Sequence, residues 1–155
     1  MGKLLFRELQ SGDIGHIAKH LRAADKQELR AVHGAVVSFS DLLSRAVLLS
    51  SHVWVATDEE PVCLFGVAPV SLLGGVGSPW MLGTERTFEH PRTLVSAGQQ
   101  YLRVMQSHYA ELFNYVDARN DRSIRWLKHL GFAFSPARPY GVQGLPFHKF
   151  ELIGG

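Results

Sequence analysis

One stretch of the chain, Asn114 to Phe132, constrains the fold more than any other, because it carries the signals of a strand, a turn and a helix in succession. It reads NYVDARNDRSIRWLKHLGF. A β-prone apolar run ends at Val116, polar residues interrupt it, and Ile124, Leu127 and Leu130 then recur at helical spacing. The stretch therefore predicts a buried strand followed by an amphipathic helix.

The ends of this helix are also encoded locally. Asn120 is a suitable N-cap, because its side-chain carbonyl accepts a hydrogen bond from an otherwise unpaired N–H group of the first turn. Gly131 is able to adopt the left-handed conformation that ends many helices. We expect Phe132 to fold back onto the helix.

The rest of the chain predicts an opening strand, three short helices, a strand meander and a long helix. The segments predicted before the long helix begin with a strand through Leu4, Phe6 and Leu9 and a helix that Ser11 or Asp13 caps and that extends to Leu21. They continue with a helix from Lys26 to Val32, a helix from Ser40 to Leu49 with Ser40 as its cap, strands His52–Thr57 and Val62–Ala68, a break at Gly74, Gly75 and Gly77, and a strand Trp80–Thr84. Apolar residues at steps of three and four then predict a helix of about six turns from Pro91 to Leu112. Short strands near Phe132–Phe134 and His148–Leu152, joined by a loop rich in proline and glycine, close the chain.

This arrangement resembles the GCN5-related N-acetyltransferase (GNAT) superfamily, in which the motif N-x-x-A-x-x-L-Y-x-x-x-G-F follows the fifth strand. Asn120, Gly131 and Phe132 match the motif, whereas Ser123, Trp126 and Leu127 depart from it. In many members the tyrosine that Leu127 replaces is the general acid that protonates the departing CoA thiolate, and a leucine has no proton to give. The resemblance implies one α/β (α+β) domain over residues 1–155. Its sheet is expected to be mixed and mostly antiparallel, with the fourth and fifth strands parallel and splayed, and flanked by helices.

Length and composition exclude several classes of protein. At 155 residues the chain is long enough for one domain, which can bury roughly 70% of its unfolded surface. The single cysteine, Cys63, lies in an apolar run, which indicates a buried thiol in a reducing compartment. The net charge of +2 is dispersed, which argues against nucleic acid as a partner. No apolar run approaches the ~20 residues that cross a bilayer, and no signal peptide is found, so we expect neither a membrane span nor export.

The resemblance also implies an acetyl-CoA site, in which a loop R/Q-x-x-G-x-G/A holds the pyrophosphate between the fourth strand and the long helix. Here the chain reads TERTFEHPR, Thr84 to Arg92, without a glycine. Side chains and Pro91 then occupy the space where backbone N–H groups would approach the anion, although Arg86 or Arg92 could still meet a phosphate. Acetyl-CoA binding is therefore left open. If it binds, the implied contacts are Leu82, Thr84, Arg86, Asn120 and Ser123, although for Asn120 we favour a role as a helix cap alone.

Candidates for a catalytic base are unspecific, since each is also typical of a solvated residue beside a strand end. They are Glu85, Glu89 and His90 near the end of the fourth strand, and His148 on the last strand. His16 and His20 would share one face of a helix, as two zinc ligands can. Without a third ligand we interpret them as surface residues, and no metal site is predicted.

Three aromatic residues, Trp80, Trp126 and Tyr140, are candidates for an interaction surface. Trp126 lies off the main apolar stripe of its helix. It therefore either packs under a neighbouring loop or lines a crevice or an interface, where tryptophan is enriched.

A narrower resemblance covers most of the chain from Trp54 onward. The segments LFGVAPVSLLGGVGSPWMLGT, NYVDARNDRSIRWLKHLGF and YGVQGLPFHKFEL together resemble a group of phage proteins related to the internal virion protein A of short-tailed phages. The resemblance implies a phage or prophage origin, other phage proteins as partners, and a location in the host cytoplasm or the virion; a homo-oligomer is left open. Two functions remain: a degenerate GNAT domain used in virion assembly, and an active N-acetyltransferase that modifies an amine of a host or phage protein.

Overall fold

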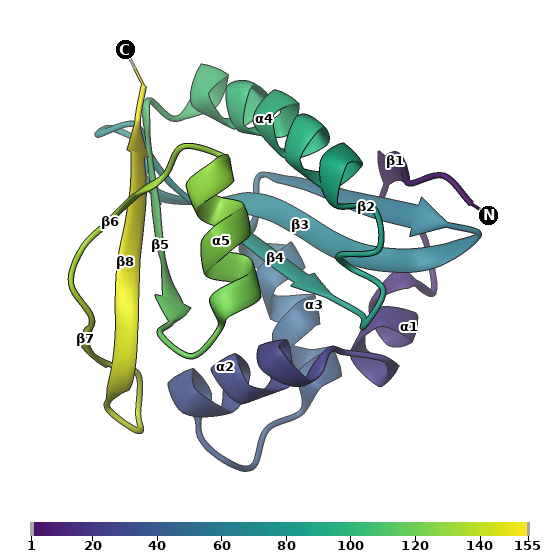
Figure 1. Cartoon of the computed structure of the whole chain (residues 1–155), viewed down its shortest axis with the longest axis horizontal. Helices are drawn as coiled ribbons and strands as arrows, with labels where there is room; N and C mark the ends of the chain where they lie inside the picture. The colour runs from purple at the N-terminus through teal and green to yellow at the C-terminus, as the bar shows by residue number, and fades with distance from the viewer. Residues whose placement is uncertain (1, 155) are drawn as a thin grey trace.

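The computed structural model describes residues 2–154, which form one mixed sheet flanked by helices (Figure 1). The strands are β1 (Leu5–Glu8), β2 (His52–Asp58), β3 (Glu60–Ser71), β4 (Val76–Gly83), β5 (Glu111–Asp117), β6 (Ala133–Phe134), β7 (Arg138–Tyr140) and β8 (Leu145–Ile153). The helices are α1 (Asp13–Lys19), α2 (Ala23–His33), α3 (Phe39–Leu49), α4 (Pro91–His108) and α5 (Asp121–His129). Within residues 2–154, no helix is both long and apolar enough to cross a bilayer.

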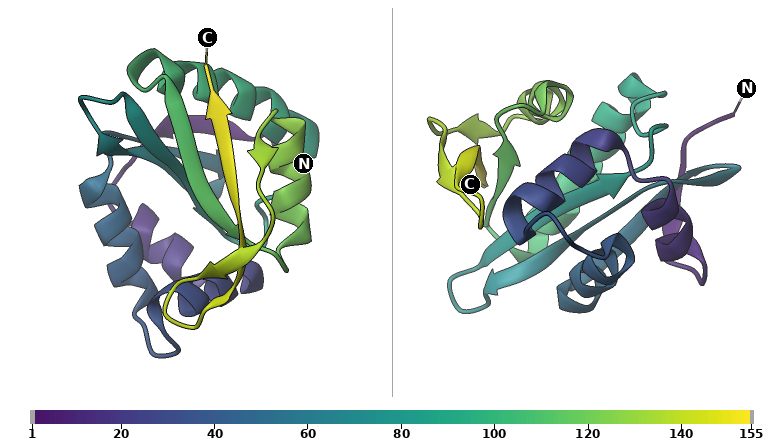
Figure 2. Two further views of the ribbon diagram at one scale, coloured as in Figure 1. Left: turned by 90° about the vertical axis from the view of Figure 1, so that its left-hand side faces the viewer. Right: turned by 90° about the horizontal axis from the view of Figure 1, so that it is seen from below.

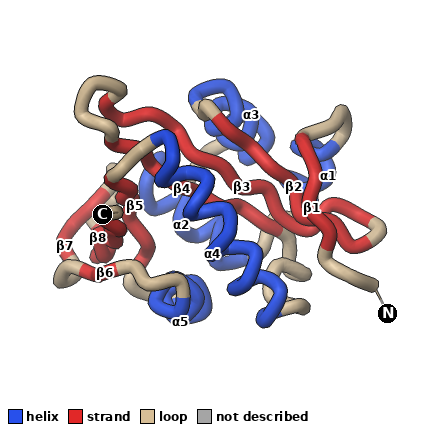
Figure 3. The backbone as a smooth tube through the Cα atoms, turned by 90° about the horizontal axis from the view of Figure 1, so that it is seen from above, coloured by secondary structure: helices blue, strands red, loops and turns tan. Residues whose placement is uncertain are grey.

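The strand order across the sheet is β1-β2-β3-β4-β5-β8-β6, with β7 paired to β8. Every neighbouring pair is antiparallel except β4 and β5. Figure 3 shows the strands as a layer between α1 and α3 on one side and α4 and α5 on the other. The predicted fold class is therefore confirmed.

The parallel strands β4 and β5 pair only at their first residues. Val76 lies beside Glu111 and Gly77 beside Leu112, and the strands then diverge into a V. Helix α2 lies across the open end of this V, as the view from below shows (Figure 2). The expected splayed pair is present, and α2 is the element that spans it.

The core has an apolar layer on each face of the sheet. On the α4 face, Leu102 and Met105 pack with Leu112 of β5, and on the opposite face Ile17 of α1 packs with Leu64 of β3. Cys63 is fully buried, as predicted, and its burial raises the pKa of the thiol to about 12. Apolar side chains therefore cover both faces of the sheet around β4 and β5.

The stretch from β5 to Phe132 folds as its sequence predicts. The backbone N–H of Ser123 donates to Oδ1 of Asn120 at 3.4 Å, so Asn120 caps α5. Gly131 has a φ of 98°, the left-handed conformation that suits glycine. Phe132 is buried in the cluster that contains Leu127 and Leu130.

The long helix is shorter than predicted, because α4 ends at His108 rather than Leu112. Tyr109 takes an extended conformation and Glu111 begins β5. Both Tyr109 and Leu112 are buried after this change. Their apolar spacing therefore fits a helix or a strand, and the sequence did not distinguish the two.

Two predicted helix caps are wrong. Helix α3 is capped by Ser38, whose Oγ accepts from the N–H of Asp41 at 3.3 Å, and not by Ser40. Helix α1 begins after Gly12 without a side-chain cap. The carboxylate of Asp13 instead pairs with the Arg7 guanidinium of β1 at 2.7 and 2.8 Å.

Two strands also differ from the prediction in their extent or in being present at all. β4 begins at Val76 and includes Gly77, which had been assigned to a glycine-rich break before Trp80. The closing loop contains β7, which pairs with β8. Proline and glycine occur in both segments, so composition alone predicted irregular structure there.

The start of the V depends on Gly77. A Cβ atom at this buried position would lie 2.8 Å from Tyr109 Cγ and 2.9 Å from Val67 Cγ2. We therefore expect Gly77→Ala to reduce the free energy of unfolding by about 1–3 kcal/mol, measured by urea denaturation. Gly15→Ala is the matched control, because nothing lies within 4 Å of its Cβ position and alanine favours the α1 helix. A Gly77 variant as stable as the Gly15 variant would contradict this packing.

Candidate functional site

A cavity of about 580 Å³ lies where β4 and β5 diverge. It extends through the sheet, because side chains of α4 and α5 line it on one side and side chains of α2 and α3 on the other. Most of its wall is apolar or aromatic. Cavities of this size and character are typical small-molecule sites. The strand edges and α2 together determine what it is able to bind.

The β4 edge of the cavity carries backbone groups without a strand partner. The Pro79 C=O and the N–H and C=O of Gly83 point toward the V, since they bond Asn114 and α2. Backbone groups of a strand alternate sides, so those of Met81 point the same way. β5 supplies ladder partners only to Val76 and Gly77. The Met81 N–H and C=O are therefore available to an extended ligand.

Asn114 bridges the two strands where they begin to diverge. Its Nδ2 donates to the Pro79 C=O at 2.8 Å, and its Oδ1 accepts from the Tyr115 N–H at 2.8 Å. The side-chain amide thus replaces the ladder hydrogen bond that the divergence removes. It closes the narrow end of the V.

Residues at the start of α2 bond the end of β4. Asp25 accepts from the Gly83 N–H at 2.9 Å and from Arg22 Nη1 at 2.8 Å, while the Arg22 N–H donates to the Gly83 C=O at 2.8 Å. Asp25 and Arg22 are both buried. The pair therefore satisfies the last β4 residue in place of a neighbouring strand.

Glu28, one helical turn further along α2, forms the corresponding hydrogen bonds with the end of β5. Its Oε1 accepts from the Asp117 N–H at 2.9 Å and from Asn120 Nδ2 at 3.0 Å. Asn120 therefore has two roles, because it also caps α5. Both hydrogen bonds of the Asn120 side chain therefore stabilise the fold.

The two α2 carboxyls have raised pKa values. Burial raises the pKa of Asp25 to about 6, against the opposing effect of Arg22. Burial raises the pKa of Glu28 to about 7, against its hydrogen bonds from Asn120 and Asp117. A carboxyl in a cavity that titrates near neutrality is able to accept and release a proton, which is the property of a general base. Glu28 is thus the candidate acid–base group of the cavity.

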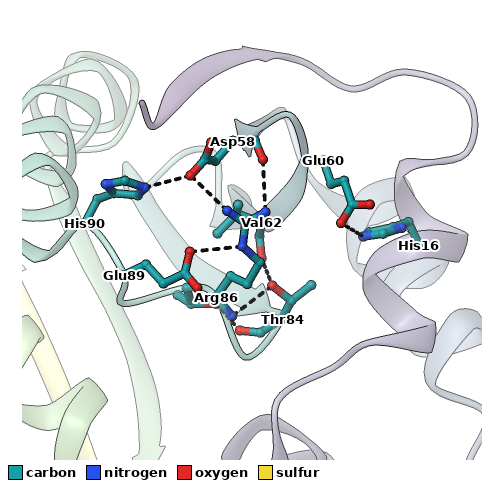
Figure 4. A network of polar contacts seen from close by, with 9 residues as sticks. His16, Asp58, Glu60, Val62, Thr84, Arg86, Glu89 and His90 are labelled. Atoms are coloured by element: carbon teal, nitrogen blue, oxygen red, sulfur yellow. Dashed lines mark hydrogen bonds and ion pairs between the residues drawn. The ribbon is translucent and has the colours of Figure 1, made fainter. Parts of the chain in front are cut away.

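The loop between β4 and α4 is held by hydrogen bonds within the domain. Four of its backbone N–H groups are bonded: Thr84 to the Val62 C=O, Thr87 to the Thr84 C=O, Glu89 to the Arg86 C=O, and Arg86 to Thr84 Oγ1. The Arg86 guanidinium donates to Asp58 and Glu89, as Figure 4 shows. The N–H groups of Glu85, Phe88 and His90 make no such bond among the described residues, so part of the loop remains open to an anion.

Side chains also fill the space between this loop and α5. Arg22 Nη1 donates to Ser123 Oγ at 3.3 Å, and its guanidinium lies 5.0 Å from the centre of the Phe88 ring. Arg122 approaches the same ring at 5.1 Å. Phe88 thus engages two cations, an arrangement worth about 1 kcal/mol or more per pair when desolvated. These contacts join α2, the loop and α5.

The sequence-predicted site residues are not gathered in one place. Leu82 and Ser123 line the cavity, whereas Thr84, Arg86 and Asn120 bond other parts of the domain. Glu85 accepts from the Ala23 N–H at 2.6 Å. His148 Nδ1 lies 2.9 Å from the Ser135 C=O, on β8 beyond β5. Glu85 and His148 are therefore not brought together.

The three aromatic candidates all line the cavity. Trp80 is held by a hydrogen bond from its Nε1 to Ser50 Oγ at 2.7 Å. Trp126 packs edge-on to Phe88 with ring centres 6.2 Å apart. Its indole nitrogen is buried without a hydrogen-bond partner among the described residues. Both interpretations of Trp126 from the sequence therefore apply, because its side chain packs against Phe88 of the loop and lines the cavity.

One group of potential metal ligands occurs in residues 2–154. Asp58, Glu89 and His90 place ligand atoms within 4.8 Å of one another. Arg86 lies among them and pairs with both carboxylates, and His90 Nε2 lies 2.9 Å from Asp58 Oδ2 (Figure 4). We interpret the group as an ion-pair network, because Arg86 already pairs with both carboxylates. His16 and His20 pack ring to ring at 4.7 Å beside Glu60.

Sequence reasoning missed the α2 residues that face the cavity. Asp25 and Glu28 occupy positions three apart, and Leu29 and Val32 continue the same face. Acids in the apolar stripe of a helix are a signal of buried carboxyls. That signal was present in the sequence, but the partners of these acids lie far along the chain.

Neither protein-family models nor curated proteins match this sequence. Solved structures do match it. Ard1 from Thermoplasma volcanium is 15% identical with a TM-score of 0.73, and the alignment covers 98% of each chain. The ribosomal-protein-S5-alanine acetyltransferase from Vibrio fischeri is 14% identical with a TM-score of 0.71, covering 99% of this chain and 94% of the other.

A third match has a bound cofactor. Spermidine N-acetyltransferase from Vibrio cholerae, in complex with CoA and spermine, is 12% identical with a TM-score of 0.68, covering 97% of this chain and 95% of the other. At such identities the likeness shows the fold and leaves the activity undetermined. The chain has the fold of the GNAT acetyltransferases.

Ionisation of Glu28 is expected to cost stability. Its pKa is raised from the usual 4.5 to about 7, so the folded state holds the proton more tightly than the unfolded state. Stability therefore falls as the pH rises through this range, and the penalty is complete above it. Glu28→Gln keeps an oxygen for both N–H donors and removes the charge. We expect it to be more stable than the wild type by about 1–2 kcal/mol at pH 8 and equal to it at pH 4.5.

Thermal denaturation at the two pH values measures this difference. Asp25→Asn is the matched comparison, because the two oxygens of Asp25 accept from different donors. Asparagine replaces one oxygen by an NH2 group, which leaves one of the two donors without an acceptor. It should destabilise the protein at both pH values. A Glu28→Gln variant that is less stable than the wild type at pH 8 would refute the assigned proton equilibrium.

Proposed function

We propose that this chain is a GNAT-fold phage protein with a degenerate acetyl-CoA site, and that it serves as a virion-associated or assembly component. The observation that carries the proposal is the loop between β4 and α4. It has no glycine, four of its N–H groups bond within the domain, and Arg86 pairs with Asp58 and Glu89, which supports a weakened pyrophosphate site. The contacts of Arg22 with Phe88 and Ser123 close the neighbouring gap.

A second departure supports the same conclusion. Leu127 stands at the position of the family's acidic tyrosine and is buried among Leu130 and Phe132. A leucine donates no proton, so this position does not assist a departing thiolate. Both losses concern the transfer reaction and neither affects the fold. A domain that keeps its fold and loses these two features is suited to binding.

The phage assignment rests on the resemblance of the three segments described above, and the surface offers a contact element for it. Leu72 and Leu73 form the tip of the hairpin between β3 and β4, and their side chains are exposed by 77% and 104%. Two adjacent exposed leucines are unusual in a hairpin turn, which polar residues form equally well, and exposed apolar side chains often mark a contact surface. This tip is a candidate for contact with another phage protein.

One observation favours a second candidate function, acetyl transfer to an amine. Glu28 lines the cavity with a pKa of about 7 and is able to take the proton of an ammonium group. Tyr101 and Tyr140 also line the cavity. Burial raises the pKa of each, so both keep a proton to donate. Glu28, Tyr101 and Tyr140 would then act as acid or base in place of the tyrosine of the family motif, from different positions in the chain.

Calorimetric titration with acetyl-CoA separates the two candidates. We expect a Kd in the high micromolar range or no binding, because the loop has no glycine to let backbone N–H groups approach the pyrophosphate and Arg86 is already paired. Micromolar acetyl-CoA should therefore leave Tm unchanged, whereas a ligand at a hundredfold excess over Kd stabilises by about 2.7 kcal/mol. Phe88→Ala, which opens the gap beside Arg22, should bind no more weakly than the wild type. A low-micromolar Kd for the wild type would restore the enzyme.

Virion assembly is tested by complementation with surface variants. Leu73→Ser should lower the yield of infectious phage while leaving Tm unchanged, because the side chain makes no buried contact and Leu72 and Leu73 form the proposed contact. Val36→Ser is the matched control, since Val36 is equally exposed at 98% but lies away from the hairpin. Normal yields with Leu73→Ser, combined with loss of yield for Glu28→Gln, would favour the enzyme instead.

A further inference from the structure

We infer that the outer edge of β1 and the groove beside it bind an extended acidic segment of another protein, which adds a strand to the sheet. Strands β2 and β3 separate this edge from the divergence of β4 and β5. The inference goes beyond the proposed function, whose contact element is the hairpin tip formed by Leu72 and Leu73. Three observations carry it: an edge without backbone partners, a groove with an aromatic floor, and two unpaired cations at one end of the strand.

Strand β1 forms one margin of the sheet, and its outer edge has no backbone partner. Its four residues pair with β2 alone. Backbone groups of a strand alternate sides, so half of the β1 N–H and C=O groups face away from β2. Beyond that pairing, β1 makes no backbone hydrogen bond among residues 2–154, and the Glu8 C=O accepts from Arg7 Nη1 at 2.9 Å. Such an edge is a template for a further strand.

A groove with a volume of about 390 Å³ adjoins this edge on the α4 side of the sheet. Its half-buried floor consists of Phe6 of β1 and Tyr101 of α4, whose ring centres lie 5.5 Å apart. The rings of Trp54 and Phe65 pack against Tyr101 at 4.8 and 5.0 Å. Every second side chain of an added strand would face this groove, because alternate residues of a strand point the same way. The exposed polar residues that line the groove are Arg92, Thr93, Ser96 and Gln100.

The end of the groove beside Leu5 is positively charged. Leu5 pairs with the end of β2, where Asp58 Oδ2 lies 2.9 Å from Nε2 of His90, the residue before α4. The first turn of α4, with Arg92, is therefore at the same end of β1 as Lys3. Both cations are exposed, and neither has a carboxylate within 4.0 Å in the part of the chain that the structure describes. Helix α4 itself contains no acidic residue, so complementary charge favours an acid of the bound segment at this end.

The charged residues of β1 restrict the partner further. Arg7 donates to both carboxylate oxygens of Asp13, at 2.7 and 2.8 Å, so its charge is already paired. Glu8 is exposed at the other end of β1 and shares the face of Phe6, so it repels an acid there. Short, charged edge strands resist pairing with strands that do not match them. The edge therefore favours a segment with apolar residues over the aromatic floor and an acid at the Leu5 end.

Calorimetric titration with two blocked pentapeptides tests the site. Each alternates valine with threonine and has one valine replaced by glutamate, at the C-terminal end in the first peptide and at the N-terminal end in the second. The glutamate then meets Lys3 and Arg92 in an antiparallel or a parallel strand, respectively. We expect the first peptide to bind more tightly, because antiparallel pairing is the more stable. In either case lysine in place of glutamate should weaken binding about fivefold or more. Failure of both glutamate peptides to bind would overturn the inference.

Methylation of the peptide nitrogens distinguishes strand addition from unspecific attraction. Only alternate N–H groups of an added strand face β1. N-methylation of one alternate set should therefore abolish binding, and N-methylation of the other set should leave it unchanged. Equal effects of the two sets would contradict strand addition.

Charge reversal in the protein tests the cationic end. Arg92→Glu should weaken binding of the glutamate peptide about fivefold or more and strengthen binding of the lysine peptide. Arg103→Glu is the matched control, because Arg103 is also an exposed arginine of α4 but does not line the groove, and it should leave both affinities unchanged. Identical binding by the two variants would refute the assigned charge contact.

Sedimentation equilibrium of the protein alone examines the other occupant that this edge could take, a second copy of the chain. A monomer leaves the edge open, as the inference requires. A dimer that the glutamate peptides neither bind nor dissociate would assign the edge to the second copy and overturn the inference.

Discussion

The divergence of β4 and β5 is the constraint on which the rest of the structure depends. A sheet that opens leaves N–H and C=O groups without strand partners, and each buried unpaired group costs about 1–3 kcal/mol. The chain satisfies several of these groups with side chains, from Asn114 at the narrow end and from Asp25 and Glu28 of α2 at the open end, and leaves those of Met81 without a strand partner. Helix α2 is therefore part of the sheet's hydrogen bonding, and its position is determined by the V.

This arrangement makes the two sides of the cavity chemically different. On the loop side, Arg86 and four N–H groups are engaged in internal hydrogen bonds, and Phe88 lies between two guanidinium groups. On the α2 side, the cavity is lined by the carboxyls of Asp25 and Glu28, whose pKa values are raised by burial.

The fold and the chemistry are therefore separate questions. Structures with 12% to 15% identity share the whole architecture with this chain. Backbone architecture tolerates such divergence because apolar volume and pattern maintain it. Side chains at the V are not determined by the backbone fold, and Leu127 is one that departs from the motif the sequence resembles. A shared fold alone therefore does not assign acetyl transfer here.

The sequence alone determined β5, α5 and the turn between them, because the signals of Asn120, Gly131 and the apolar spacing act within a few residues. It also predicted the order of the other elements except β7, whereas the parallel pair was implied by the family resemblance. It did not determine where α4 ends, since Tyr109 and Leu112 are buried in a helix or in a strand. The site was decided only by tertiary structure. Asp25 meets Gly83 across 58 positions and Glu28 meets Asp117 across 89, so no local pattern identifies the hydrogen-bond partners of these acids.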